Sequence, residues 1–291
     1  MSEINVPFVK MNGLGNQIIV ADMRTLNQKI SAEAAVALDQ QAETKFDQIM
    51  ELHGSDTPNV DNNIRILNSD GSEAEACGNG TRCVVSFLHR ENGKQEFLFR
   101  TKGGLLNSSY TDETRITVDM GVPRFSWEDI PLEEEFADTT GIELQVGPID
   151  NPILHTPSVA NIGNPHAVFW VKDDPYNYDL ERFGPMLEYH PVFPERANIS
   201  VAQITSPNTI ISRTWERGAG ITQACGSGAC AVAVCAARKG MADRNVTVTL
   251  PGGDLHILWG DNNRIQMTGP AEHEFSGLLN PVTGEFTREG A

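Results

Sequence analysis

The tetrapeptide Cys77-Gly78-Asn79-Gly80 returns in the second half of the chain as Cys225-Gly226-Ser227-Gly228, at an offset of 225 − 77 = 148 in 291 residues. The offset holds before each tetrapeptide and becomes 149 after it, giving these alignments: Asn16 with Asn164, Arg65 with Arg213, Asn68 with Glu216, Ala76 with Ala224, Gly103-Gly104 with Gly252-Gly253, Leu106 with Leu255, and Arg115-Ile116 with Arg264-Ile265. This ordered agreement predicts two similar α/β lobes, with the two cysteines facing each other across a pseudo-two-fold axis.

The segments around the two tetrapeptides follow one order of elements. A β-branched strand leads into a polar turn, a breaker-free apolar helix starts just after the cysteine, and another strand enters a Gly-Gly turn. These elements are expected at 64–67, 81–89 and 97–99 in the first half, and at 210–215, 229–239 and 246–249 in the second. Further helices are expected at 32–40 and 180–189, and most of the rest as strand.

Domain boundaries follow from the repeat and from one stretch of unusual composition. The acidic segment 123–135 contains Pro123 and Pro131 and is the expected linker. We therefore predict a first lobe over 1–124 and a second over 125–272. The last segment, 273–291, is expected to pack back on the first lobe.

Composition and charge exclude several classes of function. The chain has 39 acidic and 22 basic residues, for a net charge of −17, which disfavours nucleic acid and anionic lipid as partners. The longest run of small apolar residues, 229–237, is too short to span a bilayer, and residues 1–10 do not resemble a signal peptide. Five cysteines, an odd number, indicate free thiols in a reducing compartment. A cytoplasmic protein without nucleic-acid or membrane partners is expected.

A cysteine at a helix N-terminus is predicted to have a lowered thiol pKa, because unpaired N–H groups and the helix dipole favour the thiolate. The following glycines allow the same N–H groups to bind a small carboxylate. Two such termini at one carboxylate would place one sulfur on each face of the adjacent carbon. One thiolate could then remove a proton while the other thiol supplies one, which inverts the centre without a cofactor.

The cysteines and glycines also admit other interpretations. Cys83, Cys230 and Cys235 fall inside the apolar helices and are expected to be small core residues. Without the repeat, helix-start packing and reactivity would be equally good explanations of Cys77 and Cys225. No Cys-x-x-Cys pair exists, so no metal site is expected. The glycine stretches at 13–18 and 226–228 fit neither a dinucleotide fingerprint nor a nucleophile elbow.

The chain resembles the diaminopimelate epimerases, cofactor-independent amino-acid epimerases of bacterial lysine and peptidoglycan-precursor synthesis. The resemblance covers nearly the whole chain and is carried by these stretches: Lys10 to Asn16, Phe46-Asp47-Gln48, Asn68 to Ser72, Cys77 to Arg82, Gly163 to His166, Glu216 to Gly220, and Ala224 to Gly228. It implies an isomerase that interconverts LL- and meso-2,6-diaminopimelate without pyridoxal phosphate. It also implies a homodimer of chains with two lobes, each a strand-rich sheet or barrel around a central helix, and an active site between the lobes.

The resemblance assigns roles to individual residues. It implies that Cys77 and Cys225 are the catalytic acid/base pair and that His166 and Glu216 tune them. The backbone at Gly78, Asn79, Gly226 and Ser227 is implied to hold the reacting carboxylate. Further substrate contacts are implied for seven polar residues: Asn16, Gln48, Asn68, Asn164, Asn198, Glu216 and Arg217. This set suits a zwitterion at each end of the substrate, although each Asn alone would more often be a turn residue or a cap.

Two departures from the family pattern and two alternative functions complete the predictions. Thr44-Lys45 replaces a glycine-rich stretch before Phe46, and Ile221 stands where many members have Glu. A racemase of a proline-type amino acid is one alternative, and it would not need the distal set of Asn68, Asn198 and Arg217. A non-catalytic amino-acid binding protein is the other, and it would have no use for two opposed cysteines.

Overall fold

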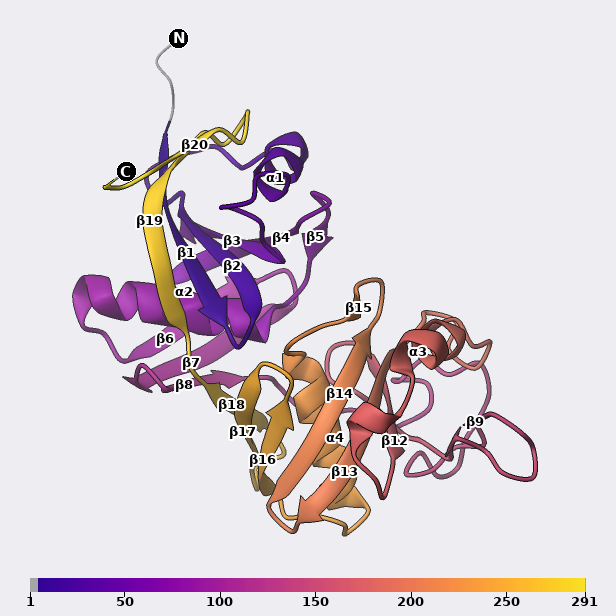
Figure 1. Cartoon of the computed structure of the whole chain (residues 1–291). Coiled ribbons are helices and arrows are strands. Elements are labelled where there is room, and N and C mark those ends of the chain that lie inside the picture. The colour runs from indigo at the N-terminus through magenta and orange to yellow at the C-terminus, as the bar shows by residue number, and fades with distance from the viewer. Residues whose placement is uncertain (1–4, 291) are drawn as a thin grey trace. The chain divides into compact units, whose positions relative to one another are not determined.

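The computed structural model describes residues 5–290, and the chain divides into two compact units (Figure 1). Unit 1 comprises Met1–Asp119 with Thr268–Ala291, and unit 2 comprises Met120–Met267. The boundaries predicted at 124/125 and 272/273 lie five residues further along the chain (124 − 119 and 272 − 267). Among residues 5–290, no helix is long and apolar enough to cross a membrane.

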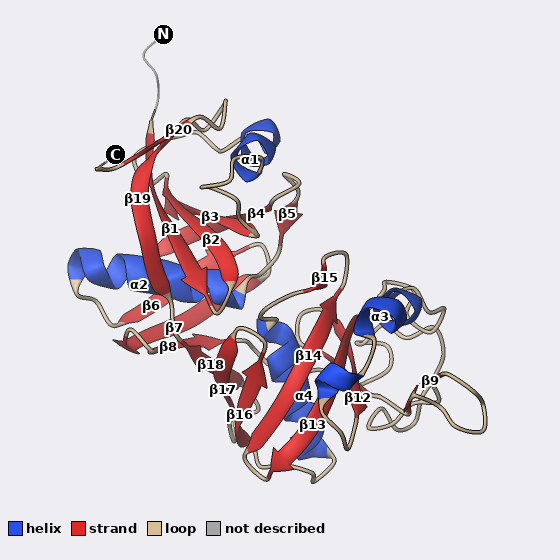
Figure 2. Cartoon of the chain, viewed as in Figure 1, coloured by secondary structure: helices blue, strands red, loops and turns tan. Residues whose placement is uncertain are grey.

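Unit 1 is rich in strands and has two helices among its described residues (Figure 2). Its elements are β1 (Val6–Gly13), β2 (Asn16–Asp22), α1 (Ala32–Asp39), β3 (Gln48–Gly54), β4 (Asn62–Asn68), β5 (Glu73–Ala74), α2 (Gly78–Asn92), β6 (Glu96–Thr101), β7 (Gly104–Asp112), β8 (Arg115–Asp119), β19 (Glu272–Leu279) and β20 (Phe286–Arg288).

Over its described residues, unit 2 is also rich in strands and has two α-helices, and it contains in addition one short 3-10 helix, η1 (Pro175–Asn177). Its other elements are β9 (Gln145–Val146), β10 (Leu154–His155), β11 (Ser158–Asn161), β12 (Pro165–Trp170), α3 (Leu180–Glu188), β13 (Asn198–Ser206), β14 (Thr209–Glu216), β15 (Gly220–Ile221), α4 (Gly226–Arg238), β16 (Asn245–Leu250) and β17 (Gly253–Trp259). β18 (Ile265–Gly269) crosses the boundary between the units.

Strand pairing confirms the repeat seen in the sequence. In unit 1, β1–β2 and β3–β4 are antiparallel, whereas β2–β3 and β4–β6 are parallel. Unit 2 repeats this order, with β11–β12 and β13–β14 antiparallel and β12–β13 and β14–β16 parallel. The turns before β7 and β17 also match, because Gly104 and Gly253 have φ values of 122° and 135°, a region that favours glycine. The two units therefore share one fold.

Each unit surrounds one central helix with strands. α2 contacts β1, β2, β3, β7 and β8, while α4 contacts β11, β12, β13, β14, β16 and β17. Both helices are buried along most of their length, and α4 achieves this with a sequence of small residues, Gly-Ser-Gly-Ala-Cys-Ala-Val-Ala-Val-Cys-Ala-Ala. Cys83, Cys230 and Cys235 are buried core residues, as predicted. A helix that is apolar all round is stable only when it is enclosed in this way.

The segment 123–135 was predicted to be a linker, and the structure contradicts this. The segment belongs to unit 2, where Ile130 and Leu132 are buried in the core. Arg124 and Asn161 exchange two backbone hydrogen bonds, both of 2.9 Å. Prolines and acidic residues indicated correctly that regular secondary structure is absent, but apolar residues between them still pack.

The C-terminal segment forms part of unit 1. β19 pairs antiparallel with β1, with Val6 opposite Leu279. The turn after β19 packs on α1, because the Ser31 amide donates to the Pro281 carbonyl (2.9 Å) and Gln41 Nε2 donates to the Gly284 carbonyl (3.0 Å).

Phe99 belongs to an apolar cluster of unit 1 and Phe169 to one of unit 2, so damage to either cluster should act mainly on its own unit. Phe99 and Phe169 are fully buried, in unit 1 and unit 2 respectively. Phe99→Ala and Phe169→Ala should each reduce the free energy of unfolding by about 3–5 kcal/mol. Hydrogen exchange should quicken mostly in α2 for Phe99→Ala and mostly in β13 for Phe169→Ala. Equal acceleration in both units for either variant would contradict this expectation.

Candidate active site

Cys77 is the N-cap of α2, with an extended backbone (φ −147°, ψ 102°). Its sulfur accepts a hydrogen bond from the Gly80 amide at 3.2 Å, as a capping side chain does. The thiol also donates to Gln48 Oε1 at 3.5 Å. Gln48 in turn donates through Nε2 to Asn68 Oδ1 at 3.4 Å. Three of the predicted site residues are thus joined by hydrogen bonds within unit 1.

Cys225 is the N-cap of α4 and repeats this arrangement in unit 2. Its sulfur accepts from the Gly228 amide at 3.3 Å and lies 3.7 Å from Ser227 Oγ. The side chain is only 3% exposed. Burial first, and the negative charge of Glu216 second, raise the pKa of Cys225 well above its ordinary value, against the smaller opposing effects of the Gly228 amide and Ser227. The predicted lowering of this pKa was therefore wrong, because desolvation of the thiolate outweighs the helix terminus.

The third residue after each cysteine is glycine for a steric reason. A Cβ at Gly80 would lie 3.1 Å from the Cys77 sulfur and would collide with Met50, and a Cβ at Gly228 would lie 3.0 Å from the Cys225 sulfur and 2.9 Å from Thr214 Oγ1. A side chain at this position would therefore push the sulfur or the sheet away.

The strand residues that pack near the N-terminus of the central helix are apolar in unit 1 and polar in unit 2. Met50 and Ile66 form a register pair in unit 1, and the equivalent pair in unit 2 is Ser200 and Thr214, whose hydroxyl groups are 2.9 Å apart. All four residues are buried. The repeat thus preserves the backbone at the cysteines while their surroundings differ in polarity.

Asn16 is held by a residue to which the sequence assigned no role. Its Nδ2 donates to Asp47 Oδ2 at 2.8 Å, and the Gln17 amide donates to the same oxygen at 2.7 Å. A carboxylate can only accept, so the amide orientation of Asn16 is fixed with Nδ2 toward Asp47. The side-chain carbonyl oxygen of Asn16 is then the group available to accept a hydrogen bond from a ligand.

His166 holds Asn164, the repeat counterpart of Asn16. His166 is fully buried, its Nε2 lies 2.7 Å from Asn164 Oδ1, and burial lowers its pKa to about 3, with the charge of Arg217 adding to the effect. The imidazole is therefore neutral at physiological pH. Protonation on Nε2 suits both ring nitrogens, since Nε2 then donates to Asn164 and the buried Nδ1, which has no hydrogen-bond partner among the described residues, is left unprotonated.

The two equivalent asparagines consequently leave different side-chain groups available to a ligand, the carbonyl of Asn16 and the N–H of Asn164. Asn16 gives its amide N–H to Asp47, whereas Asn164 gives its carbonyl to His166. A free carbonyl suits an ammonium group, and a free amide N–H suits a carboxylate. His166 contacts Asn164 as a neutral ring, and its implied role in tuning a cysteine stays a prediction.

Asn198, Glu216 and Arg217 come together at the end of β14. Asn198 Nδ2 donates to the Pro165 carbonyl (2.9 Å), and its Oδ1 accepts from the Arg217 amide (2.9 Å). The Arg217 guanidinium donates to the Glu195 carbonyl at 3.0 Å. Glu216 accepts from Thr222 Oγ1 at 2.5 Å and lies close enough to Cys225 to raise its pKa.

The two departures from the family pattern have structural explanations. Thr44 is fully buried, and its hydroxyl donates to the Leu38 carbonyl at 2.8 Å, which ties the loop before Gln48 to the end of α1. Ile221 lies in β15 opposite Trp215 and packs against the core of unit 2. Both are packing residues here.

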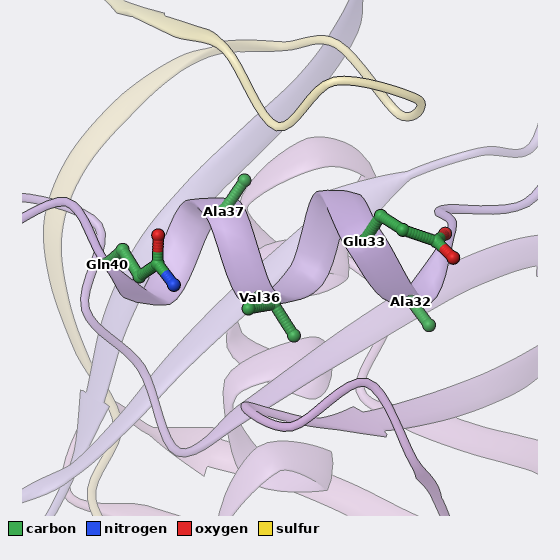
Figure 3. Close-up of a pocket in the computed structure, with 5 residues that line it drawn as sticks. All are labelled: Ala32, Glu33, Val36, Ala37 and Gln40. Atoms are coloured by element: carbon green, nitrogen blue, oxygen red, sulfur yellow. The ribbon is translucent and has the colours of Figure 1, made fainter.

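Two pockets of unit 1 contain no predicted site residue. One lies beside α1 and is lined by Ala32, Glu33, Val36, Ala37 and Gln40 (Figure 3). The other is lined by residues of β1, α2 and β19 that include Met11, Phe87 and His273. Neither pocket is lined by Cys77, Cys225 or the polar residues predicted to bind the substrate.

Removing the charge of Glu216 should lower the pKa of Cys225. In Glu216→Gln the thiolate loses a repulsive neighbour, so the alkylation of Cys225 should reach its half-maximal rate at lower pH than in the wild type. The pH dependence of iodoacetamide labelling, read by mass spectrometry of the peptide with Cys225, measures this. Glu181→Gln, an exposed change on α3, is the matched control and should have no effect. An unchanged or higher pKa in Glu216→Gln would refute the assignment.

Comparison with known proteins identifies the family. The family model of diaminopimelate epimerase matches residues 8–126 and 158–274. The chain is 61% identical to the diaminopimelate epimerase of Brucella anthropi, with 97% of this chain and 94% of that protein covered. It is 60% identical to the diaminopimelate epimerase of a Chelativorans species, with 97% and 96% covered. The crystal structure of a hydroxyproline epimerase from Agrobacterium vitis shares the fold, with a TM-score of 0.62 at 12% identity over 99% of this chain and 93% of that one. The chain belongs to the diaminopimelate epimerase family.

Proposed function

We propose that this protein is a diaminopimelate epimerase that interconverts LL- and meso-2,6-diaminopimelate with Cys77 and Cys225 as its acid/base pair. One observation carries the proposal: each unit starts its central helix on a cysteine whose sulfur caps the helix. Relatives about 60% identical over 97% of the chain bear this name, which supports diaminopimelate as the substrate and lysine biosynthesis as the context.

The reaction is a proton exchange at one carbon. The thiolate of one cysteine takes the α-proton and becomes a thiol, leaving a carbanion stabilised by the adjacent carboxylate. The thiol of the other cysteine donates its proton from the opposite face and becomes a thiolate. Atoms and charge balance without an oxidant or cofactor, and the two sulfurs have exchanged protonation states. The scheme requires both thiols to reach the same carbon.

The raised pKa of Cys225 suits one order of these steps. A pKa well above its usual range keeps Cys225 a thiol at neutral pH. The form of the enzyme with Cys225 protonated would use Cys77 as the base and Cys225 as the donor. The reverse reaction would begin from the form with Cys77 protonated and Cys225 as the thiolate.

Helix starts supply the charge stabilisation that this chemistry needs. The first N–H groups of an α-helix have no acceptor within the helix, which makes the amides of Gly78, Asn79, Gly226 and Ser227 the groups to receive the reacting carboxylate. Negative charge that develops on this carboxylate would be stabilised by the same groups.

The far end of the substrate is assigned to charged and amide groups. Arg217 with Asn68 and Asn198 would bind the second carboxylate, and Glu216, which lies close to Cys225, would accept from an ammonium group of the substrate. Asn16, Gln48 and Asn164 complete the proposed contacts. The proline-type alternative is not favoured, since the hydroxyproline epimerase resembles this chain in fold only. The homodimer and the cytoplasmic location stay predictions from the family resemblance and from composition.

Loss of either cysteine should abolish epimerisation. Cys77→Ala and Cys225→Ala each remove one of two obligatory proton carriers, so the rate should fall by about 10² to 10⁴-fold or more. The assay follows LL-diaminopimelate to the meso isomer, with solvent deuterium incorporation at the α-carbon. Cys235→Ala, a core thiol, is the control for loss of a cysteine as such. Activity within about tenfold of the wild type in either variant would rule out the two-base scheme.

Selectivity for a two-headed substrate should depend on Arg217. A site that hydrogen-bonds a group rejects analogues lacking it by about 10⁴ to 10⁵-fold. Lysine at this position loses the bidentate fork, so Arg217→Lys should reduce kcat/KM for LL-diaminopimelate while both cysteines still react with a small thiol reagent. Wild-type kcat/KM for lysine, proline and glutamate should be far lower. Equal use of any of these would favour the alternative racemase.

A further inference from the structure

A buried carboxylate that the proposed chemistry does not use lies beside the substrate-binding turn. Glu188 is the last residue of α3, and it is 2% exposed. Its Oε2 accepts from Trp215 Nε1 at 2.7 Å. Its Oε1 accepts from the Gly218 amide at 3.0 Å and from Arg196 Nη1 at 3.3 Å. Three donors from two other segments of unit 2 thus converge on one side chain.

Two of these donors flank the two charged residues that are proposed to contact the substrate. Trp215 precedes Glu216 and Arg217, and Gly218 follows them, so Glu188 holds both sides of this dipeptide. Gly218 has a φ of +78°, which places the chain in a tight turn between β14 and β15. The conformation of this turn decides where the side chains of Glu216 and Arg217 point.

The third donor ties a second segment to the same carboxylate. Arg196 lies between Glu195, whose carbonyl accepts from the Arg217 guanidinium, and the strand that begins at Asn198. Asn198 Oδ1 accepts from the Arg217 amide. Glu188 therefore fixes the turn and also the segment that supplies hydrogen-bond acceptors to Arg217.

The surroundings of Glu188 are shaped for this contact. A Cβ at Gly184, one turn earlier in α3, would collide with the Trp215 ring, so only glycine lets the indole lie against the helix. Burying a carboxylate is costly unless donors replace its water, and here three do. An apolar residue would fill the space but could not accept from the Gly218 amide.

The corresponding turn of unit 1 is held differently. Between Asn68 and Ser72, Asp70 accepts from the backbone and the hydroxyl of Ser72, and the Asn68 amide donates to the Ser72 carbonyl. These bonds are local to the turn. The carboxylate at the end of α1, Asp39, accepts from the Phe46 amide instead. The Glu188 contact thus belongs to the turn that carries two charged residues.

We propose that Glu188 is a positioning residue for substrate recognition, which holds the turn that presents Glu216 and Arg217 to the substrate. The inference rests on the proposed function, because it assigns these two residues to substrate binding. Glu188 acts through the turn and does not touch the substrate. A shift of about 1 Å in a positioned group can cost about 10²-fold in catalysis, so a loosened turn should affect binding strongly.

Steady-state kinetics on Glu188→Gln with LL-diaminopimelate tests the proposal. The amide keeps the volume of Glu188 but turns an N–H group toward one of the donors. We expect KM to rise about ten- to a hundredfold with a smaller change in kcat. A purely structural role would reduce the active fraction, and therefore kcat, while KM stayed the same. Glu181→Gln, an exposed change on the same helix, should match the wild type.

Two further variants keep the test decisive. Trp215→Phe removes one donor but retains a ring against Gly184, and it should raise KM in the same direction even if Glu188→Gln fails to fold. In the Arg217→Lys background, Glu188→Gln should add less than about twofold to the loss in kcat/KM, because both changes act on one turn. An unchanged KM in the folded variants, or fully multiplicative losses, would overturn the inference. Absence of epimerisation by the wild type would instead refute the proposed function itself.

Discussion

The proposed chemistry depends on two helices, each surrounded by strands and each capped at its N-terminus by a cysteine sulfur. Ser, Thr, Asp and Asn are the favoured N-caps, because an oxygen accepts the backbone N–H more strongly than a thiol does. Cys77 and Cys225 are therefore weak caps, and enclosure of α2 and α4 by strands compensates for this. The stability of each helix start comes from packing, which leaves the capping residue open to selection for reactivity.

The repeat supplies the same backbone twice, but it does not supply the same environment. Cys77 is partly exposed and contacts the Gln48 amide, whereas Cys225 is buried near Glu216 and Ser227. Behind the helix start, Met50 and Ile66 in one unit correspond to Ser200 and Thr214 in the other. In the proposed reaction one thiol acts as the acid while the other acts as the base, so differences between the two equivalent thiols would suit it better than strict symmetry.

Much of this was predictable from sequence because it depends on local pattern and repetition. The tetrapeptides, the β-branched strands and the glycine stops placed α2 and α4 within three residues at their starts. The packed segment 123–135 was misjudged because composition reports secondary structure and not burial. The direction of the Cys225 pKa could not be predicted, since desolvation depends on which residues cover the thiol. Asp47 and Glu188 were missed for a similar reason, because a carboxylate reveals its role only through the donors that surround it.

The position of β19 has a consequence for the order in which the chain folds during synthesis. Unit 2 is one continuous stretch, so all of it is synthesised before β19. The strand that pairs with β1 lies at 272–279, so β1 remains without this neighbour until the whole of unit 2 has been made. Domains usually fold from the N-terminus onward. Here the second unit can be complete first, and the nascent first unit exposes one edge of β1 for most of that time.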